Sequence, residues 1–339
     1  MTVWRCCKKD ATLSIEYFRF YRYVSVYYCL GSVFMYQLTE LQKKILDYKK
    51  EKNIAILAHS YQSLDILEIA DCIGDSFKLS TVAAELSQKT VVMCGVRFMA
   101  DTVKLLSPEK TVLLPASEAT CPMAEQISPE RVRRFKAEHP DFKVVAYINT
   151  TTELKAEADV CVTSSSALQI VSGLEADNIL FIPDKNLGAY IKAQLPEKNI
   201  LLWDGYCPVH NAVTVEECKS VIEAHPQATV LMHPELPQEV LRFADVIGST
   251  ADIIKYALEH EEDCIIGTER SVRDYLCMMR PERQYDMLSK HLICPDMRMI
   301  TLKDVYQAML GQGGEEINLA HETGKLAKKA IDEMIRLGK

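Results

Sequence analysis

The sequence predicts an α/β protein made of three similar αβα domains, each with a small parallel sheet, related by a pseudo-threefold axis. Two observations indicate this. Apolar runs that end in polar residues recur at 53–62, 143–150 and 228–235. Cysteine–proline pairs recur with the same period, starting at positions 121, 207 and 294. A period of about 87 residues exceeds that of solenoid repeats, so the units are duplicated domains rather than members of an array.

The three apolar runs align at their first polar residue. These anchor residues are His59, Tyr147 and His233, separated by 88 and 86 positions. A hydroxyl residue follows each anchor after 17 positions, at Ser76, Ser164 and Thr250. Cysteines follow the anchors after 62, 60 and 61 positions, at Cys121, Cys207 and Cys294. Polar groups of three kinds therefore recur in one register.

Each unit contains the same order of expected elements. Helical stretches at 39–52, 129–139 and 214–224 precede the anchors, and helix-like segments follow the hydroxyl residues. A second strand lies in "TVVMC", "NILFI" and "CIIGT". A further strand precedes the cysteine in the first two units ("TVLLPA", "NILLW"), whereas the third unit shows no clear final strand. Such alternation predicts parallel sheets covered on both faces, with ligands at the carboxyl ends of the strands.

The repeats divide the chain into a leading segment, 1–34, three αβα units at 35–127, 128–213 and 214–300, and C-terminal helices at 301–339. The leading segment shows no helical or strand period. It is also unusually aromatic, since ten of the 26 aromatic residues lie within 1–36. We therefore expect the functional chain to start at Met35, with Thr39 as the N-cap of its first helix.

Composition and charge exclude several classes of protein. The net charge of −8 argues against binding to nucleic acid or to an anionic membrane. The uncharged run 23–39 is marginal for a membrane span. Twelve cysteines without a CxxC pair indicate neither a zinc ribbon nor the framework of a small secreted protein. Dispersed thiols are typical of the reducing cytoplasm, so we expect a cytoplasmic protein that binds neither nucleic acid nor membrane.

Three cysteines at one threefold site are suited to a metal centre. A single cysteine is often a plain core residue, but core packing does not require the same residue type in three repeats. Structural zinc usually takes four ligands, and catalytic zinc usually includes histidine. A [4Fe–4S] cluster held by three cysteines leaves one iron without a protein ligand, which can act as a Lewis acid on a substrate oxygen. We therefore expect one such cluster per chain, held by Cys121, Cys207 and Cys294.

Candidate acid–base groups stand two positions apart at the strand ends. The pairs are His59 with Tyr61, Tyr147 with Asn149, and His233 with Glu235. Residues two apart on a strand point the same way, so both members of a pair face one site. Histidine titrates near neutrality and is the commonest acid–base residue. The pairs are therefore candidates for proton transfer beside the metal centre.

Other polar residues near the strand ends have two interpretations. The hydroxyl residues are either N-caps of the following helices or ligands for a carboxylate or phosphate at a helix start. His210, three residues after Cys207, is a candidate contact of cluster or substrate. The polar residues of "PDKNLG" (183–188) form either a helix-start turn or an interdomain contact, and their turn chemistry favours the first.

Eleven short motifs in this order resemble those of quinolinate synthases. They are "AHSYQ" (58–62), "GDS" (74–76), "GVRFMAD" (95–101), "CPMA" (121–124), "YINT" (147–150), "TSS" (163–165), "PDKNLG" (183–188), "GYCPVH" (205–210), "HPE" (233–235), "GST" (248–250) and "ICPDM" (293–297). The resemblance covers about 38–336. It implies a transferase that condenses iminosuccinate (iminoaspartate) with dihydroxyacetone phosphate in de novo NAD biosynthesis. Quinolinate forms as phosphate and water are lost.

The resemblance also implies roles for individual residues. Tyr61, Glu235, His59 and His233 would be catalytic, with Tyr61 and Glu235 in the proton transfers. The substrate-binding residues would be His59, Ser76, Tyr147, Ile148, Asn149, Ser164, His210, His233, Pro234, Glu235 and Thr250. L-Aspartate oxidase would be the functional partner that supplies iminosuccinate.

Two other function classes also fit three cluster-binding cysteines. Another three-cysteine cluster enzyme, such as a reductive dehydratase or a diphthamide-type radical enzyme, would share the three-unit organisation. The His/Tyr/His anchors and "HPE" favour quinolinate synthase over these. An iron–sulfur sensor would use the cluster as a switch, but it would need a partner surface or DNA-binding element, and the sequence has no basic helix.

The expected start at Met35 can be tested directly. A chain that begins at Met35 should fold and retain full activity, because the first repeat opens with the helix that follows. Soluble yield, cluster content and turnover are the measurements. An insoluble product, or one without its cluster, would show that residues 1–34 belong to the fold.

Overall fold

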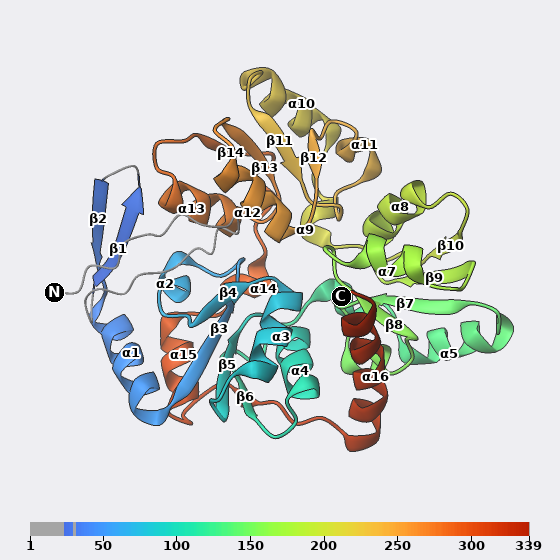
Figure 1. The fold of residues 1–339 in the computed structure, drawn as a ribbon, viewed down its shortest axis with the longest axis horizontal. Helices are drawn as coiled ribbons and strands as arrows, with labels where there is room; N and C mark the ends of the chain where they lie inside the picture. Colours follow the sequence, from blue (N-terminus) through green and yellow to red (C-terminus); the bar gives the residue numbers. More distant parts are fainter. Residues whose placement is uncertain (1–23, 30–31, 339) are drawn as a thin grey trace, which may run out of the picture.

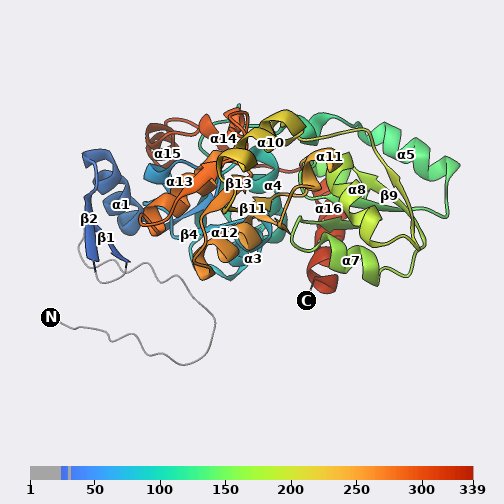
Figure 2. The ribbon, with the colours of Figure 1, turned by 90° about the horizontal axis from the view of Figure 1, so that it is seen from above.

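Three small sheets, each covered by helices, surround a common centre in the computed structural model (Figure 1). The structure describes residues 24–29 and 32–338. Figure 1 looks down the shortest axis of the molecule. The view turned by 90° shows this short dimension from the side (Figure 2). The predicted α/β architecture of three αβα units is confirmed.

The three units contain the expected elements in the expected order, together with further helices and short strands that were not expected. The first has α1 (Glu40–Lys52), β3 (Ile54–His59), α2 (Leu64–Leu67), β4 (Cys72–Gly74), α3 (Ser76–Glu85), β5 (Thr90–Cys94), α4 (Arg97–Leu106), β6 (Thr111–Leu114) and the 3-10 helix η1 (Pro122–Glu125). The second has α5 (Pro129–Glu138), β7 (Lys143–Tyr147), α6 (Thr152–Lys155), β8 (Val160–Val162), α7 (Ala167–Gly173), β9 (Asn178–Ile182), α8 (Lys185–Gln194), β10 (Asn199–Leu202) and α9 (Pro208–Asn211). The third has α10 (Val215–Ala224), β11 (Thr229–Met232), α11 (Gln238–Leu241), β12 (Val246–Ile247), α12 (Thr250–Glu259), β13 (Cys264–Gly267), α13 (Arg270–Met279), β14 (Tyr285–Met287) and α14 (Pro295–Arg298).

The strand order is the same in all three sheets. It reads β6-β5-β3-β4, β10-β9-β7-β8 and β14-β13-β11-β12, so the first strand of each unit always lies between its second and third. Neighbouring strands within each of these sets run parallel. The carboxyl ends of the first strands, which carry the anchors, therefore face the centre that the units share.

A recurring aspartate strengthens the repeat beyond the hydrophobic pattern. In each unit its Oδ2 atom accepts a hydrogen bond of 2.8 Å from a backbone N–H of the first strand. The donor and acceptor residues are Ile56 with Asp71, Val144 with Asp159, and Val230 with Asp245. The three aspartates are separated by 88 and 86 positions, the same separations as between the anchors. Each bond ties the loop after the short helix back onto the first strand.

The structure contains strands of three kinds that the sequence did not predict. The third unit does have a final strand, β14, which pairs in parallel with β13. With three residues, β14 is too short to show the alternation of apolar and polar residues that predicts a strand. The short second strands β4, β8 and β12 were not expected for the same reason. In the leading segment, which shows no strand period in the sequence, β1 (Val24–Cys29) pairs antiparallel with β2 (Ser32–Gln37), which continues past residue 34. The rest of 1–34 lies outside the described residues.

The C-terminal segment joins the first and second units. It contains α15 (Leu302–Met309), β15 (Glu315–Glu316) and α16 (His321–Leu337). Beyond the expected helices, β15 adds an antiparallel edge strand to β6. Helix α16 packs against α4 of the first unit and against α6 and β8 of the second (Figure 1). The exact division at 34/35, 127/128, 213/214 and 300/301 stays a prediction.

The first helix begins as expected. The Thr39 hydroxyl accepts a hydrogen bond from the Gln42 N–H, and the Gln42 side chain binds the Thr39 N–H in return, which forms a capping box. Ile45 and Leu46 of α1 are buried, as is Leu38 before its cap, so the apolar face of the helix points inward. None of the helices in the described ranges has both the length and the apolar character needed to cross a bilayer.

The core placement of β3 generates a stability prediction. Ile56, in the middle of this strand, has 0% exposed surface. Ile56→Ala should lower the free energy of unfolding by about 2–5 kcal/mol, because it leaves a cavity. Leu201→Ala, at a side chain 39% exposed on β10, should change it by less than about 0.5 kcal/mol. Anaerobic urea unfolding measures both, and equal losses would contradict the placement of Ile56.

Candidate active site

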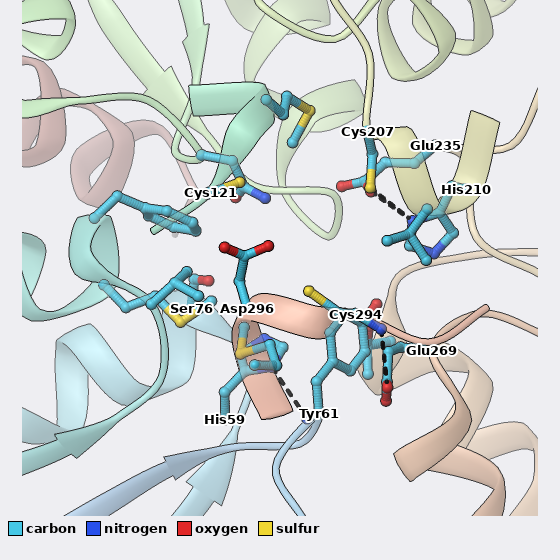
Figure 3. Close-up of a pocket in the computed structure, with 18 of the residues that line it drawn as sticks. His59, Tyr61, Ser76, Cys121, Cys207, His210, Glu235, Glu269, Cys294 and Asp296 are labelled. Atoms are coloured by element: carbon cyan, nitrogen blue, oxygen red, sulfur yellow. Dashed lines mark hydrogen bonds and ion pairs between the residues drawn. The ribbon is translucent and has the colours of Figure 1, made fainter. Parts of the chain in front are cut away.

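A cavity of about 220 Å³ lies where the strand ends of the three units meet (Figure 3). The predicted site residues that line it are His59, Tyr61, Ser76, Cys121, Tyr147, Ile148, Asn149, Ser164, Cys207, His210, His233, Glu235, Thr250 and Cys294. Pro234 is not among the lining residues. In the part of the chain that the structure describes, no lysine or arginine lines this cavity.

The three cysteines occupy equivalent places. Each is the N-cap of a short helix (η1, α9 or α14) with proline at its start, and each has an extended backbone with ψ of 108°, 116° or 110°. All three are free thiols. Burial raises the pKa of Cys121 to about 12, of Cys294 to about 11, and of Cys207 well above its ordinary value. A bound cation would supply the charge that stabilises their thiolates.

The three sulfurs do not form a compact group of the kind that holds one ion. A tetrahedral zinc with bonds of about 2.3 Å holds its sulfur ligands about 3.8 Å apart. Among the described residues, the group whose ligand atoms all lie within 4.8 Å of one another is Cys207, His210 and Glu235, and not the three cysteines. That group is a possible metal-binding site of its own, and it shares Cys207 with the cysteine triad.

Glu235 forms the most densely bonded part of the cavity wall. Its Oε1 accepts a hydrogen bond of 2.7 Å from the Tyr147 hydroxyl, and its Oε2 lies 2.9 Å from His210 Nδ1. Burial by itself would raise the pKa of Glu235. The charge interaction and hydrogen bond with His210 outweigh it, with help from His233 and Tyr147, and lower the pKa to about 2. The carboxylate is therefore ionised at neutral pH.

The anchor histidines are neutral and oriented. Burial lowers the pKa of His59 to about 3 and that of His233 to about 4. Their Nδ1 atoms accept from the backbone N–H two residues later, Tyr61 N at 3.2 Å and Glu235 N at 3.4 Å. This assigns the proton to Nε2 in both rings. Each ring can therefore donate one hydrogen bond from Nε2.

Tyr61 joins the first unit to the third. Its hydroxyl lies 2.9 Å from Thr250 Oγ1 and 2.7 Å from Thr268 Oγ1. Burial and the charge of Glu235 raise the pKa of Tyr61 well above its ordinary value, so the phenol keeps its proton. A protonated phenol beside an ionised carboxylate provides one donor and one acceptor in the same cavity.

The N-cap interpretation of the three hydroxyl residues was wrong. The caps are Asp75 for α3, Ser166 for α7 and Ser249 for α12. Ser76 and Thr250 are instead the first residues of α3 and α12, and Ser164 lies in the turn before α7. All three line the cavity, where the free N–H groups of α3 and α12 favour an anion.

Sequence reasoning missed several polar residues of the site, including Asp75, Thr120 and Thr163, which line the cavity. Thr268 bonds both Tyr61 and, at 3.2 Å, His210 Nε2. Glu269 and Asp296 line the cavity, and Figure 3 shows the Asp296 carboxylate pointing into it. Glu269 had a signal, since it lies at a repeat position 36 residues after His233. Thr268 lies next to Glu269, and Asp296 lies two residues after Cys294. Neither residue has an equivalent of the same type in the other two units, so the repeat gave no signal for them.

Comparisons with known proteins show which family the chain belongs to. A family model described as quinolinate synthetase A protein matches residues 43–336. The chain belongs to this family. It is 44% identical over 299 residues to the quinolinate synthase of Caldicellulosiruptor bescii, covering 88% of this chain and 98% of the relative. It is 44% identical over 300 residues to that of Alkaliphilus metalliredigens (88% and 99%) and 42% over 298 residues to that of Methanoregula boonei (88% and 98%). The resemblance predicted from the motifs is confirmed, and the chain is an enzyme of the quinolinate synthase type.

Proposed function

We propose that this enzyme condenses iminosuccinate with dihydroxyacetone phosphate to give quinolinate, phosphate and water, as a transferase of de novo NAD biosynthesis. The observation that carries the proposal is the meeting of three cysteine–proline loops and the Tyr61, Tyr147, His210 and Glu235 network in one cavity. The reaction needs no external oxidant, because the atoms of one iminosuccinate and one dihydroxyacetone phosphate equal those of one quinolinate, one phosphate and two water molecules. It needs groups that bind anions and move protons.

The cysteine triad would hold a [4Fe–4S] cluster, one per chain. The equivalent loops, the free and partly buried thiols, and the fact that the three described cysteines do not together form a compact single-ion group support this assignment. When bound, the cluster would present one iron without a protein ligand as a Lewis acid for a substrate oxygen. The cavity has no lysine or arginine among its described lining residues, so the open iron of the cluster would be the Lewis-acidic contact for an anionic substrate oxygen there.

The cavity residues would divide binding and proton transfer between them. Ser76 and Thr250, at the starts of α3 and α12, would bind carboxylate or phosphate oxygens together with helix N–H groups. His59 and His233 would donate from Nε2 to substrate oxygens. Tyr147, Ile148, Asn149, Ser164 and His210 complete the proposed substrate-binding set. Pro234, which was also expected in this set, does not line the cavity and is not part of the proposed set. Glu235, held ionised, would accept a proton from carbon, and Tyr61 would deliver one to a leaving oxygen.

The chemistry also determines the proposed setting of the enzyme. Iminosuccinate hydrolyses in water, so an oxidase acting on L-aspartate would be the functional partner that supplies it. An oxygen-sensitive cluster is suited to the reducing cytoplasm, which is the proposed location.

Metal analysis tests the cluster assignment. Anaerobically prepared protein should contain about four iron and four sulfide ions per chain, the content of one [4Fe–4S] cluster. Air should bleach it, because an iron without a protein ligand is open to oxidants. A single tightly bound zinc, with neither iron nor sulfide, would contradict the cluster and would point to the group of Cys207, His210 and Glu235.

Two substitutions test the proton-transfer roles. Tyr61→Phe and Glu235→Gln keep the side-chain shapes and should leave the cluster intact. Turnover, measured anaerobically as quinolinate formed from the two substrates, should fall at least about a hundredfold in each, the lower end of the contribution of a positioned acid or base. Cys218→Ser, at a cysteine in the core of the third unit away from the cavity, is the control and should change little. Near-normal turnover in both variants would refute the assignment.

A further inference from the structure

One backbone hydrogen bond ties every cysteine loop to a helix start. The helices are α4, α8 and α13, which follow the third strand of their units. The first N–H of each donates to the carbonyl two residues before the cysteine, from Arg97 to Ala119 at 2.9 Å, from Lys185 to Gly205 at 2.7 Å, and from Arg270 to Leu292 at 2.8 Å. The repeat therefore positions three loops in the same way through backbone atoms alone.

The N-cap residues of these helices differ between the units. They are Val96, Asp184 and Glu269. Asp184 Oδ1 accepts from Asn186 N and Leu187 N, both at 2.8 Å, while its Oδ2 accepts from Cys207 N at 3.1 Å. One oxygen of this carboxyl group caps the helix, and the other holds the backbone of a proposed metal ligand.

Glu269 makes the corresponding contacts in the third unit. Its Oε2 accepts from Ser271 N at 2.6 Å, and its Oε1 accepts from Cys294 N at 3.4 Å (Figure 3). Arg298 approaches the same Oε1 at 3.5 Å. Glu269 and Asp184 both have 0% exposed surface, although charged residues are rarely buried so completely. Two different acids therefore occupy one repeat position with one pattern of contacts.

These bonds restrict the ligand side chains. The N–H group and the Cα atom of a cysteine lie in one peptide plane, so an acceptor that fixes the N–H also fixes the start of the Cα–Cβ bond. Rotations about the N–Cα and Cα–Cβ bonds then direct the sulfur, and the extended backbone of Cys207 and Cys294 sets the first of these rotations. Buried acceptors keep their donors, because an unpaired polar group away from water is costly.

We propose that Asp184 and Glu269 are positioning residues that hold Cys207 and Cys294 for the cluster. Cys121, whose loop faces Val96 at the corresponding place, is held without a carboxylate. The inference rests on the proposed cluster and adds a support for two of its three ligands. Partners of metal ligands of this kind change metal affinity by about 10–100-fold when removed.

The "PDKNLG" segment extends this support to the acid–base network. Asn186 Nδ2 donates to the Glu235 backbone carbonyl at 2.9 Å and to Asn211 Oδ1 at 3.0 Å. A turn in the second unit thus positions both a proposed ligand, Cys207, and the segment that carries the proposed base.

The test uses the full chain with its cluster, prepared without oxygen. Asp184→Asn keeps an oxygen for the cap of α8 but places an amide NH2 opposite the Cys207 N–H. Glu269→Gln does the same at Cys294. Asp159→Asn is the matched control, since its carboxylate accepts the Val144 N–H away from the cavity. Iron and sulfide content, the rate at which a chelator bleaches the cluster, the electron paramagnetic resonance spectrum of the reduced cluster and the thermal midpoint are measured.

Both variants should release the cluster about ten times faster than the unsubstituted protein, the lower end of the range for such partners. Their spectra should change, while their thermal midpoints match that of Asp159→Asn. The positioning role alone would be overturned if both variants released the cluster at the rate of the unsubstituted protein. It would also be overturned if Asp159→Asn accelerated release as much as they do. If one variant does not fold, the other decides by the same measurements. Absence of iron and sulfide from the unsubstituted protein would overturn the proposed function and this inference together.

Discussion

The buried carboxylate of Glu235 is the constraint on which the central site depends. Several kcal/mol are lost when an ionised group leaves water without partners. Glu235 is 4% exposed, and its two side-chain partners, the Tyr147 hydroxyl and His210, both belong to the second unit. Those partners reach it only when the strand ends of the second and third units face each other. The same pairing that stabilises this charge therefore favours the docked arrangement and keeps a base ionised inside the cavity.

The three units repeat the same backbone arrangement, but the functional side chains at equivalent positions differ between them. The anchors His59, Tyr147 and His233 occupy one position in three identical strand orders, and so do the cysteines. Two residues after the anchors the side chains diverge into a phenol at Tyr61, an amide and a carboxylate at Glu235. The proposed condensation of two unlike substrates would require different groups on different sides of them. Substitution within a shared framework provides that asymmetry without disturbing the backbone that brings the loops together.

What the sequence predicted and what it missed follow from the range of the interactions. Apolar strands of four or more residues, Thr39 as a cap and the three cysteines are local signals, and the structure has each of them where expected. Strands of two or three residues, such as β12, are held by their neighbours and carry no period of their own. Thr268 is important because it bonds Tyr61 and His210, residues more than 50 positions away. Such contacts appear only once the three units are docked.

The "PDKNLG" segment shows why two interpretations of a motif can both hold. Its residues suit either a helix-start turn or an interdomain contact, and the sequence favoured the turn. A carboxyl group has two oxygens, so Asp184 caps α8 with one and reaches the Cys207 loop with the other. Because α8 begins at the carboxyl edge of its sheet, the turn already faces the centre, and Asn186 meets the third unit there. In a fold whose sheets all point their carboxyl ends at one cavity, the residues that start the helices are also those that hold the domains together.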